Sequence, residues 1–136
     1  MIRIFIFSYS GDAAEAVACV RCARMAVPYA SVTVVDDAAS PVQEDIADAL
    51  RSMGADYVQS TWERNGNLRG PDCIRGMLSE MCREAEDDDI LVKIDCDTAL
   101  LDDGWLRWME SRPWCPMYAS GDFIDGSWRI YGCLYA

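Results

Sequence analysis

Residues 90–97 read ILVKIDCD, a short, mostly apolar run that ends in two aspartates one residue apart. Runs of this length and composition are typical of strands buried on both faces of a parallel sheet. A similar run at residues 2–7 opens the chain, and the β-branched segment SVTVV at residues 31–35 ends at a second acidic pair, Asp36 and Asp37. The sequence therefore predicts buried strands that are each followed by polar residues.

The segments between these runs have helical patterns. The best marked begins with Ser40 as N-cap, a proline at the first helical position and Gln43 three residues on, which together form a capping box. A later helix has Asp102 and Asp103 in its first turn. Helices are expected over residues 13–27, 40–53, 71–85 and 101–109, and further short strands over 56–59, 117–119 and 128–135. The apolar side of the third helix is expected to consist of Ile74, Met77, Leu78, Met81 and Ala85.

Strands that alternate with helices through short connections predict an α/β protein, a three-layer αβα arrangement with a mainly parallel central sheet. The length of 136 residues suffices for one domain, residues 1–136, and the sequence has no repeat or linker. Ligands of such open sheets bind outside the carboxyl ends of the strands. We therefore expect a site where the polar residues follow the strands.

The composition limits the chemistry of that site. The chain has 12 Lys and Arg against 23 Asp and Glu, a net charge of −11 at pH 7, and no His. This charge disfavours binding to nucleic acid, and the lack of His leaves acid–base and metal chemistry mainly to carboxylates. Seven scattered Cys and the lack of a secretion signal or a membrane-spanning run indicate a reduced, cytoplasmic protein without a transmembrane segment. The excess of Arg over Lys is typical of a GC-rich bacterial genome.

Polar side chains follow four of the predicted strands, and all four groups should open on one rim of the sheet. In an Asp-x-Asp that leaves a strand, the chain turns between the two carboxylates, so both can face one point. Carboxylate oxygens are the ligands that Mg²⁺ and Mn²⁺ prefer, and such a cation would bridge phosphate oxygens. The groups are, in chain order, Ser8 and Tyr9, Asp36 and Asp37, residues 61–69, and Asp95 and Asp97.

These residues resemble the GT-A fold nucleotide-sugar glycosyltransferases, and most closely the large family 2 type. The likeness rests on FSYS at residues 7–10, VVDDAAS at residues 34–40, a loop rich in Asn, Gly and Arg before Pro71, and VKIDCD at residues 92–97. It extends over residues 2–101. The resemblance implies a Rossmann-like nucleotide-binding half, transfer of a sugar from a nucleoside diphosphate sugar, with UDP-linked donors favoured, and Mn²⁺ or Mg²⁺ as cofactor.

The resemblance also implies roles for individual residues. Tyr9 would lie near the nucleobase, and Asp37, or alternatively Asp36, would accept the imide hydrogen of the base. Asp95 would lie near the ribose and the metal, and Asp97 would ligate the cation. The residues implied in nucleotide binding are Ser8, Tyr9, Asp36, Asp37, Arg64, Arg69 and Asp95, and those implied in metal binding are Asp95 and Asp97.

The chain departs from the family after the Asp-x-Asp, because fewer residues follow than an acceptor-binding half needs, so we expect a truncated version of the fold. Asp122 and Asp125 are the late carboxylates that could act as general base, although Asp beside Gly is also typical of a hairpin turn. The apolar residues 128–136 are expected to form an edge strand through which two copies could pair. The alternative to an enzyme is a nucleotide-binding module that lacks the acceptor side.

Asp95 and Asp97 also resemble the first motif of the haloacid dehalogenase-type phosphohydrolases, in which the first Asp is the nucleophile. That chemistry needs a Lys downstream, and the only Lys of this chain, Lys93, precedes the motif. This second enzyme class is therefore the weaker prediction.

Other patterns favour packing or solvation. Cys19 and Cys22 have the spacing of half a zinc site but lie within a predicted helix, which favours packing. Trp105, Trp108 and Met109 have the spacing of a core-facing helical stripe. Residues 86–89 read EDDD and are expected to form a solvated turn.

Overall fold

The computed structural model of the chain describes residues 1–62, 70–112, 119–124 and 127–135, the last two ranges by their backbone. These residues form a six-stranded sheet of order β3-β2-β1-β4-β6-β5. The pairs among β1 to β4 are parallel, whereas β6 is antiparallel to both β4 and β5. The strands are β1 (Ile2–Ser8), β2 (Ser31–Asp36), β3 (Asp56–Gln59), β4 (Ile90–Asp95), β5 (Ala119–Ile124) and β6 (Ser127–Tyr135).

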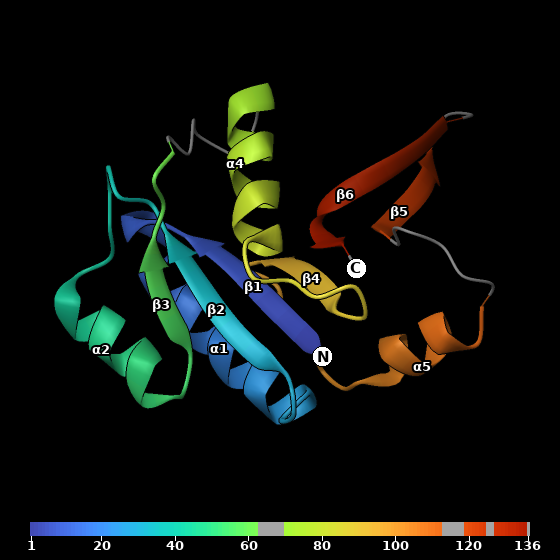
Figure 1. Cartoon of the computed structure of the whole chain (residues 1–136), viewed down its shortest axis with the longest axis horizontal. Coiled ribbons are helices and arrows are strands. Elements are labelled where there is room, and N and C mark those ends of the chain that lie inside the picture. The colour runs from blue at the N-terminus through green and yellow to red at the C-terminus, as the bar shows by residue number, and fades with distance from the viewer. Residues whose placement is uncertain (63–69, 113–118, 125–126, 136) are drawn as a thin grey trace.

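Helices cover both faces of the sheet (Figure 1). α1 and α2 lie on one face, and α4 crosses the other. The predicted three-layer α/β class with a mainly parallel sheet is confirmed. The helices are α1 (Ala13–Ala26), α2 (Glu44–Ser52), α4 (Pro71–Cys82) and α5 (Gly104–Glu110), and a 3-10 turn, η1 (Ser10–Asp12), precedes α1.

The direction of the strand order reverses at β1. From β1 the chain proceeds outward through β2 to β3, and it then returns to form β4 on the other side of β1. The registers pair Ser8 with Asp36 and Phe7 with Asp95, so the carboxyl ends of the three strands are level within one residue. In open α/β sheets, ligands bind in the crevice at such a switch point. The topology therefore predicts that a ligand binds at the carboxyl ends of β1 and β4.

Both faces of β1 are buried. Ile4 and Ile6 belong to the larger core, which the sheet shares with α1, α2 and α5, while Phe5 and Phe7 belong to a smaller core under α4. Because successive side chains of a strand point to opposite faces, burial on both sides requires an apolar residue at nearly every position. This explains the lack of polar alternation in the opening run of the sequence.

The capping box predicted at Ser40 does not form. α2 begins at Glu44, and Gln43 is the N-cap with an extended backbone (φ −64°, ψ 151°). The N–H of Val42, which a helix starting at Ser40 would hold in its first turn, donates to the Asp36 carboxylate instead (2.8 Å). A tertiary hydrogen bond to a buried charge thus overrides the local capping signal.

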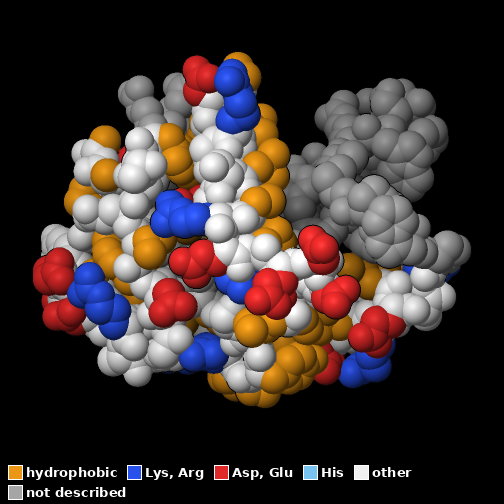
Figure 2. Space-filling view, in the orientation of Figure 1, with side chains coloured by type: hydrophobic (Ala, Val, Ile, Leu, Met, Phe, Trp, Pro, Cys, Tyr) orange, Lys and Arg blue, Asp and Glu red, His pale blue; other side chains and the backbone are white. Residues whose placement is uncertain are grey.

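The buried side of α4 differs from the prediction. Ile74 and Leu78 are 44% and 50% exposed, and Figure 2 shows hydrophobic side chains on the surface along this helix. Met77 and Met81 face the smaller core. Consecutive residues of a helix lie about 100° apart around its axis, so Leu78, which follows Met77, lies off the buried side. Its buried residues are Cys73, Met77, Glu80 and Met81.

α5 begins at Gly104 rather than at residue 101, because the Asp102 carboxylate accepts the Gly104 N–H (2.7 Å) in the turn before the helix. Trp105 packs against the larger core, as predicted, and Leu106 is buried in it. Trp108 is 50% exposed, so the predicted core-facing pair of tryptophans is wrong in its second member.

The acidic turn at residues 86–89 is solvated only in part. Residues 86–88 are exposed, but the Asp89 side chain is 3% exposed and pairs with Arg3 (2.7 Å) and with the amino group of Met1 (2.8 Å). The hydrogen bond from this amino group, followed by that from the Glu86 N–H (3.0 Å), lowers the pKa of Asp89 to about 2. The prediction of a fully solvated turn is therefore wrong at Asp89.

The C-terminal strand is not an edge of the described sheet. β6 lies between β4 and β5, because the β5–β6 hairpin folds back and pairs β6 with β4. The expectation that this segment forms an edge strand is therefore wrong for residues 128–135, while the pairing of two copies stays a prediction. In the backbone register of the hairpin, Asp122 of β5 lies opposite Arg129 of β6, so Asp122 lies in a strand rather than in a turn.

Candidate functional site

Hydrogen bonds tie together the loops that follow β1, β2 and β3. The Ser10 N–H donates to the carbonyl of Ser40 (2.7 Å), and the Asp37 N–H donates to the carbonyl of Ser8 (3.0 Å). The Ser60 N–H, just after β3, donates to the last carbonyl of β2 (2.8 Å). The carboxyl edge of the sheet is therefore braced across three strands.

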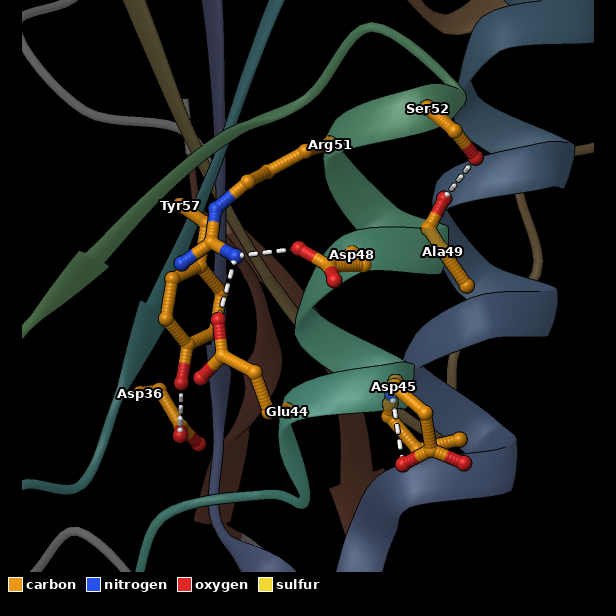
Figure 3. A network of polar contacts seen from close by, with 9 residues as sticks. Asp36, Glu44, Asp45, Asp48, Ala49, Arg51, Ser52 and Tyr57 are labelled. Atoms are coloured by element: carbon orange, nitrogen blue, oxygen red, sulfur yellow. Dashed lines mark hydrogen bonds and ion pairs between the residues drawn. The ribbon is translucent and has the colours of Figure 1, made fainter.

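Asp36 is fully buried beneath this edge. Its carboxylate accepts hydrogen bonds from the Ser8 hydroxyl (2.9 Å), the Val42 N–H (2.8 Å) and the Tyr57 hydroxyl (2.5 Å), the last drawn in Figure 3. A buried carboxylate is tolerated when its oxygens are bonded in this way. Asp36 and Ser8, itself 1% exposed, thus join β1, β2 and β3 below the surface.

Tyr57 connects Asp36 to charged side chains of α2 (Figure 3). The guanidinium of Arg51 lies 4.8 Å from the centre of the Tyr57 ring and pairs with Glu44 (2.8 Å) and Asp48 (2.7 Å). Burial, followed by the hydrogen bond with Asp36, raises the pKa of Tyr57 to about 12. The phenol therefore stays protonated and keeps its role as a donor near neutral pH.

Asp37 is half-buried and accepts the Ala39 N–H (3.1 Å) in the turn that follows β2. With Phe7, Ser60 and Trp62 it lines a hollow of about 10 Å³. A hollow of this volume has room for about one water, so a larger group must lie above it. Of the two neighbouring aspartates, Asp37 is the one that a ligand can reach.

Trp62 is a residue of this edge that the sequence analysis missed. Its ring packs on Phe7, with the centroids 6.1 Å apart, and lies over Gly76 of α4. A Cβ at Gly76 would come within 2.4 Å of the indole, so this helical position requires glycine. The sequence did contain one signal for this contact, because a glycine within a helical pattern indicates that another group packs closely against the helix. It does not indicate which residue that group belongs to.

Asp95 ends β4 and forms an ion pair with Lys93, two residues earlier on the same face of the strand. The Lys93 side chain is 4% exposed and that of Asp95 is 35% exposed, so the ammonium lies inside while the carboxylate reaches the edge. Asp97 lies beyond the strand and is exposed.

The cysteines around this motif are packed in the core. Cys19 is buried in α1, and its thiol donates to the carbonyl of Asp95 (3.7 Å). Burial is the main cause that raises its pKa to about 12, so the thiol stays protonated and unreactive. Cys96 is also buried in the larger core. The prediction that packing accounts for Cys19 is confirmed.

The oxygen donors of Asp95 and Asp97 fit a hard divalent cation such as Mg²⁺ or Mn²⁺. Within residues 1–62 and 70–112, no three ligating side chains surround one point. A cation there would complete its coordination with water or ligand oxygens, as Mg²⁺ commonly does. Asp37 lies across β1 from this motif, about 10 Å away at the usual spacing of strands, so it shares the edge but not the cation position.

Tyr9 follows β1 at the switch point and is 37% exposed. Arg64, Arg69 and Asp125 lie outside the described residues, as does the side chain of Asp122. The predicted site residues that the structure brings to one edge are Ser8, Tyr9, Asp36, Asp37, Asp95 and Asp97.

Comparison with known proteins gives matches to solved structures. No protein-family model and no curated protein match the sequence. Two structures of LgtC match, one of an active-site mutant and one of the galactosyltransferase in complex with donor and acceptor sugar analogs. The TM-score is 0.62 in both cases, at 16% and 17% identity, over 99% of this chain and 56% of LgtC.

The fold is GT-A glycosyltransferase-like. This GT-A-like chain spans 56% of the length of the LgtC structures that it matches. The assignment to the family 2 type stays a prediction. Within the described part of the chain, no helix is both long and apolar enough to cross a membrane.

Proposed function

We propose that the chain is the donor-binding part of a glycosyltransferase and binds a nucleoside diphosphate sugar, with UDP-linked donors favoured. The observation that carries the proposal is the switch point between β1 and β4, where Tyr9, Asp37, Asp95 and Asp97 share one edge of a GT-A-like sheet. LgtC, which has a similar fold, is a galactosyltransferase studied with donor and acceptor sugar analogs.

The nucleobase end of the donor belongs beside Asp37. The carboxylate of Asp36 is buried and already accepts three hydrogen bonds, whereas Asp37 is open to solvent and can accept the imide hydrogen of uracil. Tyr9 would lie against the base. Arg64 and Arg69 are the candidates for further contacts to the base or the phosphates.

The diphosphate end belongs at Asp95 and Asp97, which would hold Mn²⁺ or Mg²⁺. When bound, the cation stabilises the charge of the departing diphosphate. A chain with a net charge of −11 repels a diphosphate, so a cation held by its own carboxylates supports binding. Asp122 and Asp125 are the candidates for the general base that would accept the proton of the acceptor hydroxyl.

Thermal unfolding with UDP, with and without Mn²⁺, tests donor binding. UDP at about 100 times its Kd should stabilise the chain by about 2.7 kcal/mol, or about 5–10 °C in Tm, only when Mn²⁺ or Mg²⁺ is present. Asp97→Asn should abolish the shift. Asp56→Asn removes an exposed charge at the start of β3, three residues before the carboxyl end of that strand, and should preserve the shift. A shift without metal, or no shift with either metal, would contradict the proposal.

Release of UDP from a panel of donor sugars tests transfer. Release that needs the same metal and is lost in Asp97→Asn indicates an enzyme. Metal-dependent binding without release favours the nucleotide-binding module instead.

A further inference from the structure

The only lysine of the chain, Lys93, is buried within the sheet beside the proposed cation site. Its Cα partner on β1 is Phe5, and the partner of Asp95 is Phe7, both residues of the smaller core. The lysine stem therefore stands in a row of buried apolar side chains. Burial of an ammonium costs free energy unless a carboxylate pairs with it, and the Lys93 ammonium pairs with Oδ1 of Asp95.

This ion pair changes the charge that a cation meets at the strand end. Asp95 and Asp97 carry two negative charges, and Lys93 offsets one of them. A cation bound to Asp95 at about 2.1 Å would lie only about 4–5 Å from the ammonium, since the same carboxylate would contact both. The affinity of carboxylate sites for divalent cations depends on their charge count, so Lys93 opposes cation binding.

We infer that Lys93 competes with the divalent cation for Asp95 and thereby holds the affinity for metal low until a diphosphate is present. This inference rests on the proposed function, because it assumes the cation position at Asp95 and Asp97. The negative oxygens of a diphosphate offset the repulsion between the cation and the ammonium. Metal and nucleotide therefore bind with positive coupling, each raising the affinity for the other by the same factor.

Asp97 is the stronger anchor in this arrangement. It is exposed and lies beyond the strand, whereas the charge of Asp95 is shared with Lys93. The competition is thus confined to one of the two ligands, which permits weak binding of the cation in the absence of nucleotide.

Calorimetric titration of the full chain with Mn²⁺ alone tests the competition. Lys93→Met keeps an unbranched stem and removes the charge, and it should bind Mn²⁺ about tenfold more tightly, since screening as strong as that of bulk water still leaves an effect of this size on a doubly charged ion. Lys93→Arg keeps the charge and should bind like the wild type. Arg83→Met removes an exposed positive charge directly after α4, outside the proposed site, and should leave the affinity unchanged.

A second titration, of UDP with and without Mn²⁺, measures the coupling. Mn²⁺ should raise the affinity for UDP in both proteins, and because the ammonium repels the cation with or without UDP, Lys93→Met should also bind Mn²⁺ more tightly when UDP is present. Lys93→Gln serves if the methionine variant does not fold. Unchanged or weaker binding of Mn²⁺ to folded variants without Lys93 would overturn the inference alone. The absence of Mn²⁺ binding in every variant, with and without UDP, would overturn the proposed metal site as well.

Discussion

Replacement of each of the neighbouring aspartates Asp36 and Asp37 by alanine makes the same chemical change at adjacent positions and should have very different effects on stability. The Asp36 carboxylate is fully buried and accepts three hydrogen bonds, so Asp36→Ala leaves three donors beneath the edge without their acceptor. Each buried donor left without a partner costs about 1–3 kcal/mol. The two hydroxyl donors can rotate and recover part of this cost, which leaves a loss of about 3–4 kcal/mol.

Asp37→Ala should cost less than about 0.5 kcal/mol, because it removes one hydrogen bond, to the N–H of Ala39, at a half-buried position in a turn. Urea unfolding followed by tryptophan fluorescence measures both losses. The Asp36 variant should lower the midpoint by about 2 M and Tm by about 10–15 °C, while the Asp37 variant should unfold like the wild type. In the UDP titration, Asp37→Ala should lose more affinity for UDP than Asp36→Ala, since only Asp37 faces the proposed ligand.

Equal losses in the two variants would refute this division of roles. A loss below about 1 kcal/mol in Asp36→Ala would show that the buried network contributes little to stability. The control is Asp36→Asn, which keeps the shape and one accepting oxygen and should lose less than the alanine variant.

Two further perturbations test the packing of the sheet. Gly76→Ala places a methyl group 2.4 Å from the indole of Trp62. The gain of about 1 kcal/mol in helix propensity should be outweighed by an overpacking cost of about 1–3 kcal/mol. Thermal unfolding should therefore report a net loss of stability, which a second substitution, Trp62→Leu, should relieve. The Asp89 carboxyl has its pKa lowered to about 2, chiefly by the amino group of Met1. Because this folded-state pKa lies below the ordinary value near 3.9, its contribution is complete above about pH 4 and disappears as the pH falls toward 2. Asp89→Asn should therefore unfold at lower urea than the wild type at about pH 6, and the difference should shrink on acidification; a difference independent of pH would contradict the linkage.

The sequence predicted the elements whose residues repeat a simple pattern. Short, mostly apolar runs predicted β1 and β4, and the segment at residues 56–59 predicted β3 with the bounds that the structure has. Alternation of strands and helices predicted the layers, and the rule for open sheets predicted that Tyr9, Asp37 and Asp95 share one edge. These features follow from local periodicity, so a single sequence contains them.

Positions that depend on a distant partner could not be predicted in this way. The capping signal at Ser40 is a strong local pattern, but the bond from Val42 to Asp36 moves the start of α2 to Glu44. In the same way, the docking of α4 exposes Ile74, although the helical pattern itself was correct.

The sequence by itself determined the architecture and the acidic character of the carboxyl edge, because hydrophobic periodicity selects strands and helices and the aspartates directly follow the strands. Only the tertiary structure decided which of these carboxylates is buried, which is accessible and which is paired with a cation. Asp36 is buried by donors from three segments, Asp37 remains open, and Asp95 is paired with a lysine enclosed in the sheet. The physical reason is that the state of a charge depends on its burial and its partners, which are set by residues far apart in the chain.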